Sequence, residues 1–104
     1  MPELERFTVI VLRRPANAPD LPEAELDRLQ EAHLDFMAAE RAAGTLLVNG
    51  PFDERPDESW RGLCIYTVGF EEAQRIAAND PLVLAGRLEL QPLGWLVPPG
   101  LLPS

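Results

Sequence analysis

The chain has 104 residues, 46% of them hydrophobic, with 17 acidic against 9 basic side chains and a net charge of −8. That length and composition predict one globular domain and exclude wholesale disorder, while the acidic balance disfavours nucleic acid and anionic membrane surfaces as partners. No apolar run is long enough to span a bilayer, Met1–Glu5 lacks the features of a signal peptide, and Cys64 is the only cysteine, so we expect a cytoplasmic protein.

The first element is the β-branched apolar run Phe7–Leu12, which predicts a strand. Both of its faces are mostly apolar, so we expect it to be covered on both sides and not to lie at a sheet edge. The proline-containing segment 13–20 then predicts a loop.

A long helix is predicted from about Pro22 to Ala43, because Pro22 suits a first turn and Gly44 suits the position just past the end. The only histidine, His33, falls near the middle of the inward-facing arc of this helix. The same side of the helix carries Leu26, Leu29, His33, Phe36, Met37 and, two turns beyond the histidine, Glu40.

Two further strands are predicted over Thr45–Pro51 and Trp60–Val68, joined by the polar, acidic segment 52–59. A Gly-Pro pair stops the first of them. Gly62 lies inside the second, which suggests a bulge or a point where another group approaches the backbone closely.

A second helix over Phe70–Asn79 and a fourth strand over Leu88–Gln91 complete the pattern. Pro92 and Gly94 are expected to close the regular structure. A proline-rich tail follows over about 97–104.

The element order βαββαβ predicts an α+β fold, the ferredoxin-like plait, with a four-stranded antiparallel sheet and both helices on one face. The other face also needs a cover, because the first and third predicted strands carry apolar or aromatic residues on both sides. A second copy of the chain is the simplest cover, so we expect a homodimer.

Several short motifs run along the chain in a consistent order, namely His33–Phe36, Gly44, Asn49–Phe52, Gly62, Glu71–Ala73, Asp80-Pro81 and Ala85-Gly86. Together they resemble the YCII-related domain family over nearly the whole chain, up to Trp95. The resemblance implies one YCII-like domain over 1–104, with a ferredoxin-like fold that pairs into a dimeric α/β barrel. Two features depart from the family: Gly69 replaces the expected Ser or Thr helix cap, and the tail beyond Trp95 has no counterpart.

The resemblance also implies an active-site cleft with a histidine and an aspartate, which by motif match are His33 and Asp80. Relatives with assigned activity include a dehydrochlorinase of a chlorinated hydroxyquinol, and the wider barrel superfamily includes muconolactone isomerase. A histidine has an ordinary pKa of about 6.5, so a His–Asp pair suits proton abstraction beside a carbonyl, isomerisation or elimination. The alternatives are a core histidine that a carboxylate satisfies, and an Asp-Pro turn.

Candidate substrate contacts lie on the predicted strands and near the last one. The Gly-Pro pair could let a ligand approach the backbone, and the arginines and the tyrosine could anchor a carboxylate or phenolate. The candidates are Gly50, Pro51, Arg61, Tyr66 and Arg87. The alternatives are a simple strand stop for the Gly-Pro pair and surface or barrel-wall positions for the others. Trp60 and Trp95 are expected to pack or to lie at the dimer contact, and the alternative is that they line the pocket.

The sequence favours no cofactor. One histidine and one cysteine cannot build a usual zinc site, and the dispersed glycines form no phosphate loop. Cys64 is expected to be an inert strand residue, since no histidine lies near it in sequence. We therefore expect no metal, nucleotide or haem. Two functions stay open: a cofactor-independent lyase or isomerase of dehydrochlorinase-like type, or a non-catalytic dimeric domain that binds a small metabolite or a partner.

Overall fold

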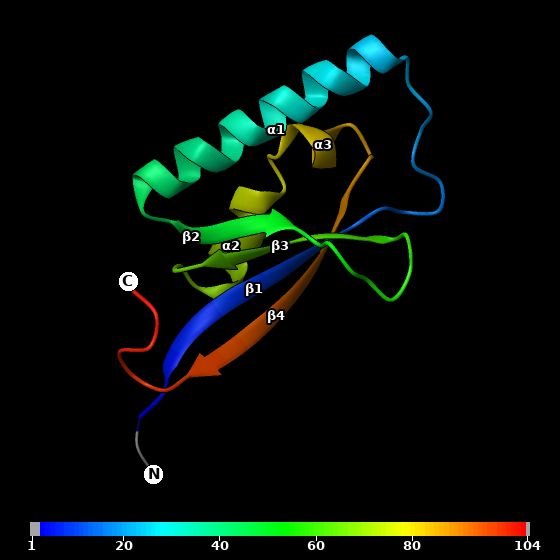
Figure 1. Cartoon of the computed structure of the whole chain (residues 1–104). Helices are drawn as coiled ribbons and strands as arrows, with labels where there is room; N and C mark the ends of the chain where they lie inside the picture. Colours follow the sequence, from blue (N-terminus) through cyan, green and yellow to red (C-terminus); the bar gives the residue numbers. More distant parts are fainter. Residues whose placement is uncertain (1–2, 104) are drawn as a thin grey trace.

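The computed structural model describes residues 3–103, so Met1 and Pro2 of the acidic N-terminus and Ser104 of the predicted tail lie outside the described residues. The elements are β1 (Glu5–Arg13), α1 (Glu23–Ala43), β2 (Leu46–Pro51), β3 (Trp60–Tyr66), α2 (Phe70–Ala77), α3 (Pro81–Leu84) and β4 (Glu89–Val97), shown in Figure 1. None of the described helices is long and apolar enough to cross a membrane.

The four strands form one antiparallel sheet in the order β2-β3-β1-β4. The α+β class and the ferredoxin-like plait predicted from the element order are confirmed by this topology. β1 lies inside the sheet between β3 and β4, as its two apolar faces indicate. The sheet edges are β2 and β4.

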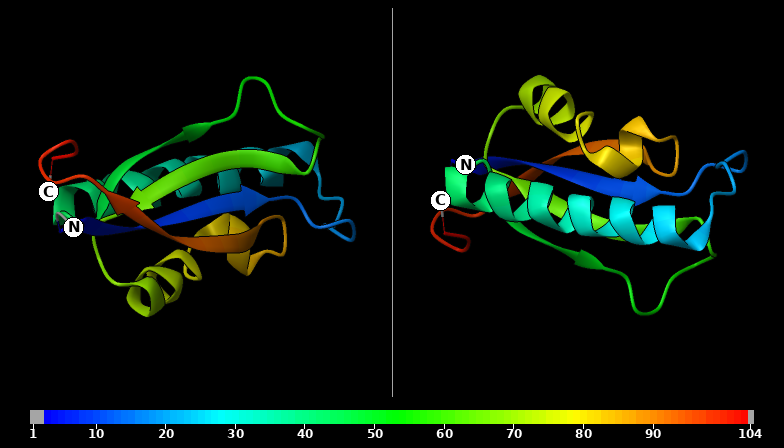
Figure 2. Two further views of the ribbon diagram at one scale, coloured as in Figure 1. Left: turned by 90° about the horizontal axis from the view of Figure 1, so that it is seen from below. Right: turned by 90° about the horizontal axis from the view of Figure 1, so that it is seen from above.

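Both long helices pack on the same face of the sheet. Seen from above in Figure 2, α1 runs in front of the strands, with α2 and α3 to one side of it. Side chains from β1, β3, α1 and α2 meet there in the main core, which includes Ile10, Leu12, Met37, Cys64, Tyr66, Ala73 and Ala77. The candidate site lies next to this core.

The opposite sheet face, here called the open face, is also apolar. Pairing between strands places Phe7, Val9, Leu47, Val48, Leu63, Ile65, Leu93, Trp95 and Val97 on it. The tail turns back over one end of this face, where Leu102 packs and the Gly100 N–H donates to the Glu5 carboxylate at 2.6 Å. Leu93 and Trp95 keep 48% and 42% of their surface exposed.

The fourth strand differs from its prediction. β4 runs through Pro92 and Gly94 to Val97, so the expectation that these two residues end the regular structure is wrong. β4 is an edge strand that pairs only with β1, and a proline without an N–H is tolerated where one side of the strand has no partner.

The helix boundaries follow the predicted stop signals, with one addition. α1 ends at Gly44, whose φ of 82° favours glycine and whose N–H donates to the Arg41 carbonyl at 3.1 Å. α2 ends at Ala77, two residues short of the predicted Asn79. The short helix α3 was not predicted, and it begins directly after Asp80.

Candidate functional site

His33 of α1 and Asp80, which precedes α3, meet beneath α1. The ring atom Nδ1 lies 2.7 Å from the carboxylate atom Oδ2. The Asp80 side chain is fully buried, whereas 12% of the His33 side chain stays exposed. Because a carboxylate oxygen accepts, Nδ1 carries the proton here, and Nε2 is the ring nitrogen left for a ligand.

The position of Asp80 follows from its neighbours in sequence. Pro81 takes the first position of α3 and keeps Asp80 non-helical, with φ −57° and ψ 128°. Its atom Oδ1 accepts the Leu82 N–H at 2.9 Å, as a helix-capping aspartate does. One carboxylate oxygen therefore caps α3 while the other holds the His33 ring. The Leu82 N–H and the ring N–H together supply the donors that a buried carboxylate needs.

His33 opens onto a cleft of about 250 Å³ between α1 and the ends of β2 and β3. This volume is small beside the pockets that hold drug-sized ligands, so it suits a small molecule. The cleft is lined by Leu12, Arg14, Gln30, His33, Leu34, Asn49, Gly50, Pro51, Arg61, Gly62, Leu63, Cys64, Leu82 and Leu88.

The structure gathers some of the residues that the sequence singles out and separates others. Gly50, Pro51 and Arg61 line the cleft together with the histidine. Tyr66 does not, because its side chain is fully buried in the main core, so a substrate contact would need the core to open. Arg87 donates to the Pro19 carbonyl at 2.8 Å and is not part of the lining. The substrate-contact roles stay predictions.

Arg14 is the main cleft residue that the sequence analysis missed, because it falls in the predicted loop. Its neighbour Arg13 stacks over the Trp60 ring at 4.7 Å and donates to Gln91 at 2.8 Å. Successive side chains at a strand end point to opposite faces. Two arginines directly after a buried strand were therefore a signal that one of them would reach each side of the sheet.

Two buried groups beside the His–Asp pair are held in their neutral forms. Burial, and then the negative charge of Asp80, raises the pKa of the Cys64 thiol to about 12. Burial is also the chief cause that raises the pKa of Tyr66, with the charges of Cys64, Asp80 and Glu40 adding to it. Within the described residues, the Tyr66 hydroxyl has no hydrogen-bond partner. Cys64 is thus a packed thiol and no nucleophile at neutral pH.

A larger hollow of about 480 Å³ lies at the other end of the strands, beside Thr8, Phe70 and Trp95. Among the described residues that line it, Arg6 alone has an ionisable side chain, so the acid–base groups favour the His33 cleft as the reactive site. No cluster of three or more His, Cys, Asp or Glu residues that could hold a metal ion occurs within 3–103.

Comparison with known proteins agrees with this fold. A family model described as the YCII-related domain matches residues 6–93. A solved structure of 5-chloro-2-hydroxyhydroquinone dehydrochlorinase from Burkholderia phenoliruptrix AC1100, in complex with 2,5-dihydroxybenzoquinone, superposes with a TM-score of 0.58. The two chains are 21% identical, over 86% of this chain and 92% of the dehydrochlorinase chain, which is a likeness of fold. No curated protein matches the chain.

Proposed function

This chain belongs to the YCII-related domain family, and we propose that it is a cofactor-independent enzyme of lyase or isomerase type. The observation that carries the proposal is the 2.7 Å contact between His33 Nδ1 and the buried Asp80 carboxylate, at the wall of a cleft. His33 acts as the general acid and base, and Asp80 orients its ring. Proton transfer and the departure of a leaving group change no oxidation state of the protein, so the proposed chemistry needs no cofactor.

In this proposal His33 Nε2 takes a proton from a carbon next to a carbonyl, or from a hydroxyl group, of the bound molecule. In an elimination the electrons of the broken C–H or O–H bond form the new double bond, C=C or C=O, and the leaving group departs with its bonding pair. In an isomerisation His33 returns the proton to another atom. Asp80 faces the imidazolium that forms and balances its charge. The dehydrochlorinase of the same fold supports elimination as the first reaction to test.

The proposal includes a homodimer that works in the cytoplasm. The open face supports the dimer, since Val48, Leu93 and Trp95 keep 50%, 48% and 42% of their surface exposed on a sheet face without a helix. Apolar sheet faces of this kind are covered in stable proteins, and a second copy supplies a self-complementary cover. The single cysteine, Cys64, fits a reducing compartment.

A substrate screen tests the enzyme. Chlorinated and unchlorinated hydroxyquinols, lactones and carbonyl compounds with an acidic C–H are incubated with the protein, and proton loss or halide release is followed. We expect His33→Asn to lower any turnover by about 10²-fold or more, the usual contribution of a general acid–base group. Asp35→Asn, on the exposed side of α1, is the matched control. Equal turnover in His33→Asn and the native protein would exclude this mechanism.

The second candidate is a non-catalytic dimeric domain that holds a small metabolite or a partner. One observation favours it: the His33–Asp80 contact also joins α1 to the capped start of α3, which is a structural use of both residues. Saturable binding of compounds that are never transformed, with binding unchanged in His33→Asn, would select this function over the enzyme.

A further inference from the structure

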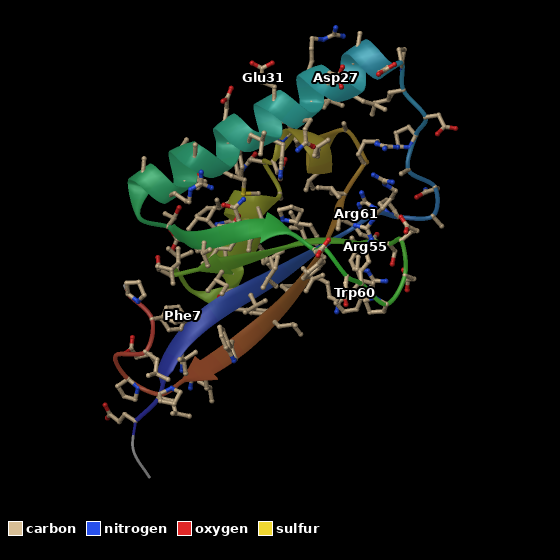
Figure 3. The ribbon with its side chains drawn as sticks, in the orientation of Figure 1. Phe7, Asp27, Glu31, Arg55, Trp60 and Arg61 are labelled. Carbon is tan, nitrogen blue, oxygen red and sulfur yellow. The ribbon has the colours of Figure 1, made fainter. Side chains whose placement is uncertain are left out.

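Arginines gather at one end of the His33 cleft although the chain is acidic overall. Arg14 and Arg61 line the cleft. Burial, followed by the positive charges of Arg61 and Arg87, lowers the pKa of Arg14, and Glu58 is the one acid that opposes this effect. Figure 3 shows Arg55 and Arg61 close together at the end of the sheet, by the connection between β2 and β3.

Arg14 differs from the other arginines of this group because its side chain has no hydrogen-bond or ion-pair partner among the described residues. Arg55 and Arg61 both approach the Glu58 carboxylate at 3.4 Å, and Arg87 donates to a backbone carbonyl. No side-chain hydrogen bond or ion pair joins Arg14 to another residue within 3–103, and its Nε atom is buried without a partner. A buried donor without a partner is costly, so a ligand that accepts from it gains affinity.

Acidic side chains on α1 face away from the cleft. Asp27 and Glu31 project from α1 on the side away from the sheet in Figure 3. An unpaired guanidinium in a concave site produces a local field that raises the concentration of anions there. A guanidinium also binds planar oxyanions with two parallel hydrogen bonds, which a neutral ligand cannot use as well.

We propose that Arg14 and Arg61 form an anion subsite at the mouth of the cleft, and that the ligand is a small organic anion, either a carboxylate or a phenolate-type oxyanion. The charged group of the ligand lies on the arginines, and its remaining atoms extend along the cleft toward His33. The cleft volume of about 250 Å³ limits the ligand to a small molecule. This subsite rests on the proposed function, since it names the substrate class of the same cleft.

Binding of matched anionic and neutral compounds tests the subsite. The full chain is titrated with benzoate, with 2,5-dihydroxybenzoate and with the neutral isostere benzamide, and binding is read from the amide NMR shifts of Gly50, Gly62 and Leu63. We expect both anions to bind at these amides and benzamide to bind about tenfold more weakly, the usual worth of a charge-assisted hydrogen bond. Arg14→Gln should weaken both anions to the level of benzamide, and Arg14→Lys should restore part of the loss.

Arg28→Gln is the control, because it removes one positive charge from the exposed side of α1 and does not touch the cleft. Equal loss in Arg28→Gln and Arg14→Gln, equal binding of benzoate and benzamide, or no saturable shift with either anion would each overturn the subsite. The failure of the enzyme is a separate result. If the protein binds benzoate through Arg14 but transforms no compound, the anion subsite is supported and the proposed reaction is excluded. If it transforms a compound and Arg14→Gln leaves the turnover unchanged, the reaction is supported and the anion subsite is excluded.

Discussion

Gly62 of β3 pairs with Pro51 of β2, and a Cβ atom added at Gly62 would lie 2.9 Å from the carbonyl oxygen of the preceding residue, Gly50. Real Cβ atoms do not approach backbone this closely, so the two strands would have to separate. The close backbone approach that the sequence suggests for Gly62 is therefore confirmed. Both glycines line the His33 cleft, so its geometry depends on this contact.

Gly62→Ala should lower the free energy of unfolding by about 1–3 kcal/mol, as overpacking of a tight site does. It should also shift the amide NMR signals of Gly50 and Phe52 more than those of α2. Urea unfolding measures the stability. Gly69→Ala is the matched control, since an added Cβ there meets nothing within 4 Å. Equal stability of the two variants would contradict the close contact.

Two substitutions separate the two roles of Asp80, which are to cap α3 and to hold the His33 ring. Asp80→Ala removes both, and should cost about 2–4 kcal/mol of stability from a lost helix cap and an unsatisfied ring donor. Asp80→Asn keeps a capping oxygen for the Leu82 N–H but places a donor group opposite His33. We expect it to lose much less stability while the ring proton moves to Nε2, which NMR of the ring nitrogens detects.

If Asp80→Asn and Asp80→Ala lose the same stability, the capping bond to Leu82 contributes nothing. If the Nε2 proton does not appear in Asp80→Asn, the carboxylate does not set the tautomer of His33. Either result would remove one of the two roles that the geometry assigns to this side chain.

Tyr66→Phe tests whether the buried hydroxyl is used. The hydroxyl has no partner within the described chain, so its removal should leave stability unchanged or raise it by about 1 kcal/mol. Thermal unfolding measures the change, with Tyr66→Leu as a control that removes the ring as well and should destabilise strongly. A clear loss of stability in Tyr66→Phe would contradict a hydroxyl without a partner, and a loss of ligand binding would contradict its separation from the cleft.

Stability should fall in alkaline solution because Cys64 keeps its proton in the fold. Burial raises its pKa from 9.0 to about 12, so above about pH 9 the unfolded chain loses this proton and the native chain holds it. The contribution is complete below pH 9 and is lost as the pH rises toward 12, with a slope of up to about 1.4 kcal/mol per pH unit. The raised pKa of Tyr66 acts in the same direction.

Urea unfolding of native protein and Cys64→Ala, from about pH 8 to about pH 11, measures this slope. The variant should show a flatter decline, with the remainder due to Tyr66. Parallel declines of the two proteins would mean that the thiol titrates normally in the fold. Rapid labelling of native Cys64 by a thiol reagent at neutral pH would contradict its burial directly.

The open face supports a prediction about assembly. Leu93→Glu should convert the proposed dimer to a monomer at micromolar concentration, because it would bury a charge in the proposed apolar contact between two copies. Sedimentation equilibrium measures the mass. Leu84→Glu is the control, since Leu84 is 71% exposed on α3 and lies off the open face. A native protein that sediments as a monomer would exclude the homodimer.

Most of the fold was predictable from short stretches of sequence, because the signals that define its strands and helices lie within those stretches. The apolar run of β1 and the Pro22 and Gly44 signals around α1 depend on neighbouring residues only. The predicted end of β4 was wrong because a proline such as Pro92 indicates the end of a strand unless the strand is known to lie at a sheet edge. α3 has four residues, too few for a periodic signal, although Asp80-Pro81 is a recognisable cap and first position.

The candidate site was predictable in part. The inward arc of α1 placed His33 correctly, and the family motif supplied Asp80 as its counterpart. Arg14 could not be placed from its own surroundings, because its position in the cleft depends on the pairing of β1 with β3 and on the angle of α1. Tyr66 lies on the same face of β3 as Cys64, but only the packing of both helices shows that it is sealed from the cleft.

Both outer strands of the sheet contain a proline, Pro51 in β2 and Pro92 in β4. A proline lacks the N–H that a newly arriving strand would pair with. Pro92 interrupts the free rim of β4, and Pro51 ends the free rim of β2. An arriving strand therefore finds only short runs of backbone to pair with at either rim, which disfavours growth into fibrils.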